Sequence, residues 1–194
     1  MRDEFDRLVY KPAVAEDPSL ALLNTRDFLN EKVSIESAQD LEFTNQCMQE
    51  ALRYCPPSPT SQIYFATEDV KLGKYYFKKG DQLCINMLAL HHNPKEWQRP
   101  MEMLPDRFNH ESPLSLTPEG KKRHNCSNIP FHGGMRVCFG KTLAESNLKI
   151  LATYMTQKFD MKFEDPRYET QMPLAQVHQS NTPDIWLKLT ARQE

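Results

Sequence analysis

The segment at residues 131–140, FHGGMRVCFG, constrains the fold most strongly, because a glycine-rich loop there leads directly into a helical pattern. Glycine adopts positive φ and lets a backbone approach a flat ligand closely, so Gly133, Gly134 and Gly140 predict tight turns. From residue 141 to about 158, apolar residues recur at helical spacing and predict one long helix. Its expected apolar face consists of Leu143, Ala144, Leu148, Leu151, Ala152 and Met155.

Cys138 lies in this loop, just before the predicted helix. The positive end of a helix and its free amide groups favour a thiolate there. Arg136 is placed to hold a carboxylate or to add positive potential, while Phe131 and Phe139 are large enough to exclude water. A dry thiolate with amide donors is one way in which a protein tunes a bound metal. Considered alone, Cys138 is also consistent with an ordinary buried structural cysteine.

The composition indicates one folded domain. The chain has 194 residues, of which 39% are hydrophobic, and a formal net charge of -2. So small a charge argues against nucleic acid as a partner. The charged start does not resemble a signal peptide, and no apolar run is long enough to span a membrane. The five cysteines are odd in number and include no CxxC pair, which argues against a disulfide framework and favours reduced thiols in a cytosol-facing compartment.

The pattern of apolar residues predicts a mainly α chain with a smaller β part, an α+β protein. Residues 1–55 are expected to be helical, with Phe5, Leu8 and Val9 on one face. A loop is expected over residues 11–19 and a second helix around residues 20–30. A further helix is expected from an N-cap at Ser37 to about residue 54, where CPPSP ends it. The expected apolar face of that helix consists of Phe43, Cys47, Met48, Ala51 and Leu52.

Residues 56–93 are expected to be the β region. Their β pattern extends to about Leu90 and consists of aromatic and β-branched runs such as QIYFAT and QLCINMLAL. A short helical turn is expected from Pro94, and residues 94–130 form an irregular, proline-rich meander. Long meanders of this kind tend to be functional. The cysteine loop at 131–140 and the helix at 141–158 follow. Residues 159–194 form a C-terminal hairpin region in which DIWLKLT is one strand.

Three motifs occur in one order along the chain. EALR contains Glu50 and Arg53, three residues apart on one helix face. PDRF contains Arg107, and the cysteine loop reads F-x-x-G-x-R-x-C-x-G at Phe131, Gly134, Arg136, Cys138 and Gly140. Together these motifs resemble the E-x-x-R, P-E-R-F and haem-loop signatures of the cytochrome P450 family, with Asp106 in place of glutamate. The chain resembles the C-terminal portion of that fold.

The resemblance implies a role for each matching residue. Cys138 corresponds to the axial thiolate ligand of haem b and Arg136 to the arginine that pairs with a haem propionate. Phe131 corresponds to the aromatic residue near the sulfur, and Gly134 and Gly140 match the turn positions of the loop. The cluster of Glu50, Arg53 and Arg107 would be structural and would hold the meander against the helix.

The resemblance also implies a monooxygenase that inserts one oxygen atom of dioxygen into a small lipophilic substrate. Electrons from NADPH would arrive through a partner, either a flavoprotein reductase or a ferredoxin. Full-length relatives would lie on the cytosolic face of the endoplasmic reticulum, held by sequence upstream of this chain, whereas the chain by itself is expected to be soluble.

Lys121, Lys122 and Arg123 are either a solvated loop or part of the surface that receives an acidic redox partner. His91 matches a structural histidine, and Cys47, Cys55, Cys84 and Cys126 are expected to be plain thiols.

The chain departs from the family pattern in several ways. It lacks the A/G-G-x-x-T motif and the central helix over the distal haem face, has His132 where glycine or serine is usual, and has no arginine at residues 56–67. Alone, it is therefore expected to have little or no activity. Two alternatives stay open: a truncated, non-catalytic relative that binds haem weakly or needs another chain, and a zinc or redox-thiol module, which the cysteine spacing disfavours.

Overall fold

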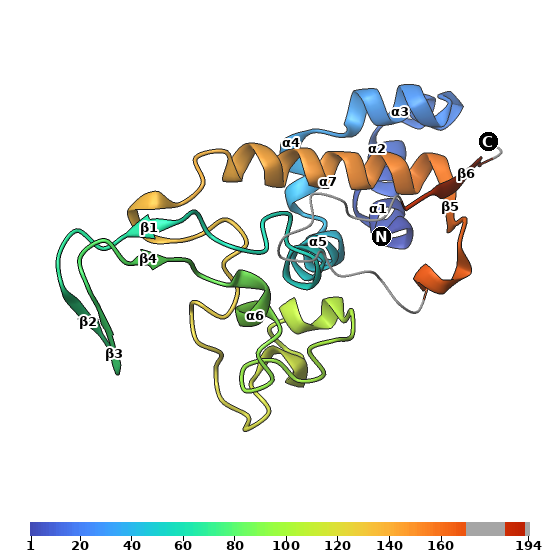
Figure 1. Cartoon of the computed structure of the whole chain (residues 1–194). Helices are drawn as coiled ribbons and strands as arrows, with labels where there is room; N and C mark the ends of the chain where they lie inside the picture. Colours follow the sequence, from blue (N-terminus) through green and yellow to red (C-terminus); the bar gives the residue numbers. More distant parts are fainter. Residues whose placement is uncertain (170–184, 193–194) are drawn as a thin grey trace.

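The computed structural model describes residues 1–169 and 185–192. A long helix, α7 (Lys141–Lys158), crosses the molecule, and the N-terminal helices gather around its C-terminal half (Figure 1). The strands β1 to β4 form an arm that extends away from these helices. The described part of the chain is mainly helical, with three two-stranded antiparallel sheets. None of its helices is both long enough and apolar enough to cross a membrane.

The chain starts with α1 (Arg2–Phe5), the π-helical turn η1 (Asp6–Tyr10) and α2 (Lys11–Glu16). The loop predicted over residues 11–19 is therefore wrong for most of its length. Pro12 stands at the start of α2, where the fixed φ of proline suits the first turn of a helix. The 3-10 turn η2 (Pro18–Leu22) and α3 (Thr25–Lys32) then cover the region of the helix predicted around residues 20–30.

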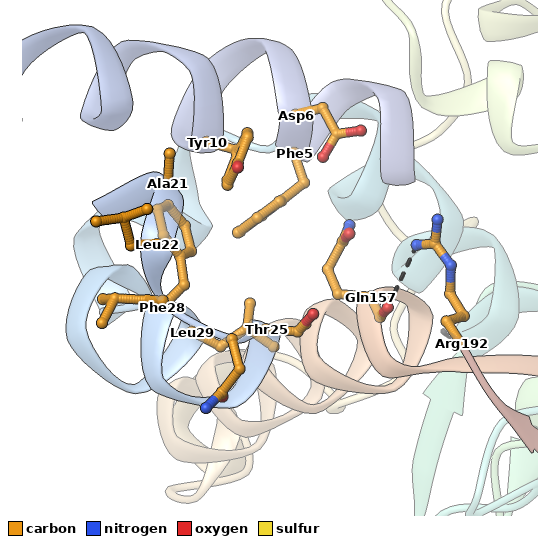
Figure 2. Close-up of a pocket in the computed structure, with 12 residues that line it drawn as sticks. Phe5, Asp6, Tyr10, Ala21, Leu22, Thr25, Phe28, Leu29, Gln157 and Arg192 are labelled. Carbon is orange, nitrogen blue, oxygen red and sulfur yellow. Dashed lines mark hydrogen bonds between the residues drawn. The ribbon is translucent and has the colours of Figure 1, made fainter. Parts of the chain in front are cut away.

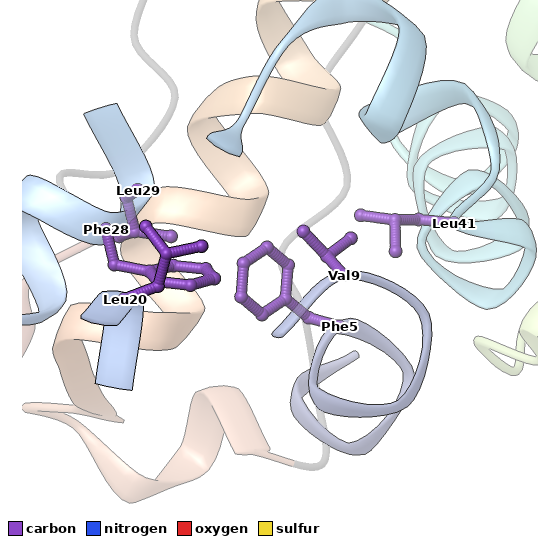
Figure 3. Close-up of a cluster of buried hydrophobic side chains, with 6 residues drawn as sticks. All are labelled: Phe5, Val9, Leu20, Phe28, Leu29 and Leu41. Atoms are coloured by element: carbon purple, nitrogen blue, oxygen red, sulfur yellow. The ribbon is translucent and has the colours of Figure 1, made fainter. Parts of the chain in front are cut away.

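These N-terminal elements enclose a hydrophobic core (Figure 3). Its buried members are Phe5, Val9, Leu20, Phe28, Leu29 and Leu41. Phe5 and Val9 are four residues apart and face the core together, whereas Leu8, expected on the same face, is 39% exposed. The rings of Phe5 and Phe28 meet edge to face, with centroids 6.4 Å apart. Burying each side chain of this size contributes roughly 1.5–3 kcal/mol.

The helix predicted from Ser37 is two helices, α4 (Ile35–Gln39) and α5 (Glu42–Tyr54). Ser34 is the N-cap of α4, and Ser37 lies inside that helix. The two serines form a reciprocal capping box, in which Ser37 N donates to Ser34 Oγ at 3.2 Å and Ser34 N donates to Ser37 Oγ at 2.9 Å. Asp40 ends α4 as its C-cap.

The start of α5 is held by a residue near the N-terminus of the chain. The buried Glu4 carboxylate accepts hydrogen bonds from the amides of Phe43 at 2.5 Å and Thr44 at 3.0 Å. A carboxylate from another helix thus serves as the N-terminal cap of α5. The expected apolar face is only partly correct, because Phe43 is 45% exposed. The buried residues of α5 are mainly polar: Thr44, Gln46, Glu50, Leu52, Arg53 and Tyr54.

The β region contains two short antiparallel pairs. β1 (Tyr64–Phe65) pairs with β4 (Gln82–Leu83), and β2 (Val70–Leu72) pairs with β3 (Tyr75–Phe77). The β pattern predicted to extend to Leu90 is wrong at its end, where α6 (Met87–His91) forms instead. Asn86 caps α6 by accepting from the Ala89 amide at 2.9 Å.

An irregular segment follows, with 3-10 turns η3 (Pro105–Phe108), η4 (Pro113–Ser115) and η5 (Gly134–Arg136). At the turn expected from Pro94, the Trp97 amide donates to the Asn93 carbonyl at 2.9 Å, as in one turn of helix.

After α7, strand β5 (Phe159–Phe163) pairs with β6 (Leu187–Ala191), and η6 (Pro166–Glu169) follows β5. The predicted DIWLKLT strand begins before β6, and its Asp184 lies outside the described residues.

The helix α7 has the predicted bounds, but its predicted apolar face is not buried. Leu143 is 67% exposed and Leu151 is 58% exposed, whereas the buried positions are Thr153 and Gln157. The helices α1, α3, α4 and α5 all pack against α7. The exposed leucines are therefore an apolar surface that no described part of the chain covers.

Candidate functional site

Cys138 lies at the surface, between η5 and the start of α7. Its amide donates to the Phe131 carbonyl oxygen at 2.9 Å and closes the loop, while its own carbonyl accepts from the Lys141 amide at 3.2 Å. Because the residue is exposed, a buried structural cysteine is the wrong interpretation. The other cysteines, Cys47, Cys55, Cys84 and Cys126, are also free.

Two loop residues adopt a positive φ: Gly134 at 67° and His132 at 63°. Gly133 is extended and Gly140 has a φ of -83°. A positive φ at the loop glycines is thus found only at Gly134. At Gly140 the missing side chain matters instead, because a Cβ there would lie 3.8 Å from Cys138 Sγ. Glycine leaves this side of the sulfur uncovered.

Replacing His132 with glycine is expected to stabilise the chain by about 0.5–1 kcal/mol. The left-handed conformation costs a residue with a Cβ roughly 1–2 kcal/mol, and glycine recovers this at the expense of some chain entropy. The urea midpoint measures the change. Met135→Gly, at an exposed position in η5 where φ is not positive, is the matched control and should lower stability. A less stable His132→Gly variant would show that the imidazole makes a contact worth more than the strain.

The apolar residues of the loop face solvent. Phe139 is fully exposed and Phe131 is half-buried, so the prediction that they dry the site does not hold for Phe139. Arg136 is exposed and has no ion-pair partner among the described residues. The loop therefore exposes a thiol, an unpaired guanidinium and an apolar ring to solvent.

Glu50, Arg53 and Arg107 form a fully buried ion cluster, called here the Glu50 cluster. Arg53 binds the carboxylate through two atoms: its Nε donates to Glu50 Oε2 at 2.7 Å and its Nη2 donates to Oε1 at 2.8 Å. Arg107 Nε donates to Oε1 at 3.1 Å, and the Leu104 amide donates to the same oxygen at 2.8 Å. Both carboxylate oxygens are therefore satisfied, as a buried charge requires.

The remaining guanidinium groups bind backbone carbonyls of the irregular segment. Arg53 donates to the carbonyls of His91 and Pro100, both at 2.9 Å, and of Glu102 at 3.1 Å. Arg107 donates to the carbonyls of Gln98, Arg99 and Glu102. Burial lowers the pKa of Arg107, and the Glu50 charge opposes that shift. The Glu50 cluster thus ties α5 to the backbone around residues 98–104.

Arg123 extends this network. Its guanidinium carbon lies 4.2 Å from the centroid of the buried Trp97 ring. Its Nη1 donates to the Leu114 carbonyl at 2.7 Å and its Nη2 to the Arg107 carbonyl at 2.8 Å. Burial lowers its pKa. These contacts hold Arg123 within the chain, whereas Lys121 and Lys122 are exposed. The spacing of residues in the sequence does not predict that the Arg123 guanidinium stacks on the Trp97 ring.

His91 links the Glu50 cluster to the cysteine loop. Its ring is fully buried, and its Nε2 accepts from the Ile129 amide at 3.0 Å, two residues before Phe131. Its carbonyl binds Arg53. Burial, the neighbouring His92 and the positive Arg53 lower the pKa of His91 to about 4. No hydrogen bond or ion pair joins the Glu50 cluster directly to Cys138 in residues 1–169 and 185–192, so the connection runs through His91.

Comparison with known proteins agrees with these features. The family model for cytochrome P450 matches residues 23–186. The chain belongs to the cytochrome P450 family. It is 32% identical over 157 residues to cytochrome P450 4A10 of Mus musculus, covering 81% of this chain and 29% of that protein. It is 35% identical over 120 residues to the steroid 17-alpha-hydroxylase/17,20 lyase of Pan troglodytes, covering 61% of this chain and 22% of that protein.

The fold agrees with part of a solved P450 haem domain. The haem domain of cytochrome P450DA matches with a TM-score of 0.66 and 28% identity, over 83% of this chain and 33% of that structure. The chain thus spans about a third or less of the P450 proteins it matches. The resemblance stated from the motifs is confirmed at the level of the family. The described residues show a mostly helical architecture with small sheets that corresponds to part of the haem domain.

The residues of the cysteine loop fit a haem, which the family implies. The thiol is exposed, and nothing lies within 4 Å of a Cβ built at Gly133 or Gly134, which leaves room for a flat macrocycle. An unpaired arginine stands two residues from the sulfur. As for the zinc hypothesis, no group of three or more His, Cys, Asp or Glu side chains able to hold a metal ion occurs in the part of the chain that the structure describes.

Proposed function

We propose that this chain is the C-terminal, haem-ligating portion of a cytochrome P450 monooxygenase that lacks the central distal helix. The observation that carries the proposal is the exposed Cys138 thiol on a glycine-flanked loop at the start of α7. Cys138 would be the thiolate ligand of haem b, and Arg136 would pair with a propionate. Phe131 would lie near the sulfur, and Gly134 and Gly140 would shape the turns of the loop.

Each residue has a physical task in this proposal. The bound haem would supply the iron at which dioxygen is activated. A thiolate at Cys138 would donate electron density to that iron. Arg136 neutralises a carboxylate at the rim. The Glu50 cluster and His91 are positioning residues, since they hold the irregular segment from which the loop extends.

The family supports further parts of the proposal. One oxygen atom of dioxygen would be inserted into a small lipophilic substrate, with electrons from NADPH delivered by a flavoprotein reductase or a ferredoxin. The exposed Lys121 and Lys122 would be available to an acidic partner. A place at the endoplasmic reticulum membrane would depend on sequence outside this chain. We propose the helical part up to residue 55, the meander over residues 94–130, the cysteine loop over 131–140 and the hairpin region from residue 159 with the bounds predicted from the sequence, whereas the β region ends before α6.

If Cys138 binds the haem iron, the absorption spectrum of the chain should show it after haem is added and the sample is reduced under carbon monoxide. The wild-type chain should show a strongly red-shifted Soret band, and Cys138→Ser should lose it. Cys126→Ser removes another exposed thiol and should keep the band. A band retained by Cys138→Ser, or no such band in the folded wild-type chain, contradicts haem-thiolate ligation here.

A second candidate is a truncated relative that binds haem weakly, or only together with another chain, and has little or no activity. The exposed Leu143 and Leu151 favour it, because a complete domain would not leave this helix face open to water. Titrating the same sample with haem separates the two, since tight and saturable binding by the chain alone supports only the first.

A further inference from the structure

A cavity of about 480 Å³ lies far from the cysteine loop, between η1, η2, α3 and the C-terminal end of α7 (Figure 2). Gln157, which lines it, is 17 residues beyond Gly140 along a helix that rises 1.5 Å per residue. The cavity is therefore about 25 Å from the start of α7. Its volume is within the range of small-molecule sites. Its apolar wall consists of Phe5, Tyr10, Leu22, Leu23, Phe28 and Leu29.

Gln157 places an unsatisfied amide in this cavity. The residue is only 7% exposed, and its Nε2 has no hydrogen-bond partner among the described residues. In Figure 2 its side chain rises from α7 toward Phe5 and Asp6. A buried amide without a partner is unfavourable, and such groups in folded proteins usually bind a ligand or an ordered water. The amide therefore marks the polar end of the cavity.

Arg192 lines the same cavity and adds a positive charge next to Gln157. Its Nη1 donates to the backbone carbonyl of Gln157 at 3.3 Å, and its backbone amide donates to the backbone carbonyl of Lys158 at 3.0 Å. No carboxylate pairs with Arg192 within residues 1–169 and 185–192. The backbone contact holds the strand end against α7, while the remaining guanidinium hydrogens are available to a ligand.

We propose that this cavity binds a small monocarboxylate with an apolar body. The carboxylate would accept hydrogen bonds from the Gln157 amide and the Arg192 guanidinium, whose fork suits a carboxylate. The apolar body would lie against Phe5, Tyr10 and Phe28. Asp6 also lines the cavity, and its negative charge disfavours a second carboxylate on the ligand. The site is distinct from the haem loop and does not depend on haem binding.

Calorimetric titration of the purified chain with 4-phenylbutyrate tests this site. Saturable binding is expected, together with a higher melting temperature, because a ligand of the folded state stabilises it. Arg192→Gln and Gln157→Leu should each weaken binding at least about tenfold, since each removes a donor to the carboxylate. Gln157→Leu should also melt at a higher temperature without ligand, because it removes the unsatisfied amide.

Three controls define the chemistry. Lys188→Gln removes an exposed positive charge from β6, the strand just before Arg192, and should leave the affinity unchanged. 4-Phenylbutanol has the same apolar body without the carboxylate and should bind at least about tenfold more weakly. Asp6→Asn should bind 4-phenylbutyrate as tightly as the wild type or more tightly. The proposal is overturned if 4-phenylbutyrate does not bind, if Arg192→Gln binds it unchanged, or if Asp6→Asn weakens it.

Discussion

Replacing Glu50 with glutamine is expected to destabilise the chain by about 3–5 kcal/mol. The carboxylate is fully buried and accepts hydrogen bonds from Arg53, Arg107 and the Leu104 amide. Glutamine keeps the size but removes the negative charge, so two buried guanidinium groups would be left without a counter-charge. Many domains have a total stability of only about 5–15 kcal/mol. The free energy of unfolding, measured by urea denaturation, should therefore fall by a large part of its total.

Glu102→Gln is the matched control for this experiment. Glu102 also pairs with an arginine three residues away, Arg99, at 3.1 Å, but both side chains are 53% exposed. Exposed pairs of this kind contribute roughly 0–1 kcal/mol, so the control should be nearly as stable as the wild type. If Glu50→Gln does not fold, the loss of its far-ultraviolet circular dichroism beside a folded Glu102→Gln gives the same answer. A Glu50→Gln variant within about 1 kcal/mol of the wild type would contradict the role of the cluster.

The Glu50 cluster also shows how much of the site the sequence could predict. Spacing places Glu50 and Arg53 on one helix face, and the PDRF motif suggests Arg107 as a third member. The motifs do not reveal that the guanidinium groups bind carbonyls of Gln98, Pro100 and other residues of the irregular segment. Carbonyls are common to every residue and carry no sequence signal. The stacking of Arg123 on Trp97 could not be predicted from the sequence either, because it depends on a turn with no regular period.

The errors in the helices have a different cause. Apolar periodicity predicts a face to be buried, but burial also needs a neighbouring element. Leu143 and Leu151 have the correct spacing and stay exposed, because the packed helices meet α7 on another side. Conversely, α5 buries Glu50 and Arg53, since a satisfied ion cluster can occupy an interior position. Local rules therefore fix where α7 begins and ends, while long-range packing decides which of its faces meets water.

Stability is expected to fall as the pH is lowered from about 6.5 to 4, by up to about 3 kcal/mol through His91. The pKa of His91 is lowered from 6.5 to about 4 in the folded chain. Between these values the unfolded chain binds a proton that the folded chain does not, so acid favours unfolding. Protonation would also turn Nε2 from an acceptor into a donor that faces the Ile129 amide. The contribution is thus present above pH 6.5 and is lost on acidification.

Urea denaturation at several pH values between 4 and 7 measures this dependence, and His91→Gln isolates its source. Glutamine does not titrate, and its side-chain oxygen can accept from the Ile129 amide, so the slope should become clearly shallower. It should not vanish, because burial also lowers the pKa of His92. His110→Gln changes an exposed histidine and should follow the wild-type curve. An unchanged slope in His91→Gln would mean that protonation elsewhere opens the chain and that His91 is not the source of the acid sensitivity.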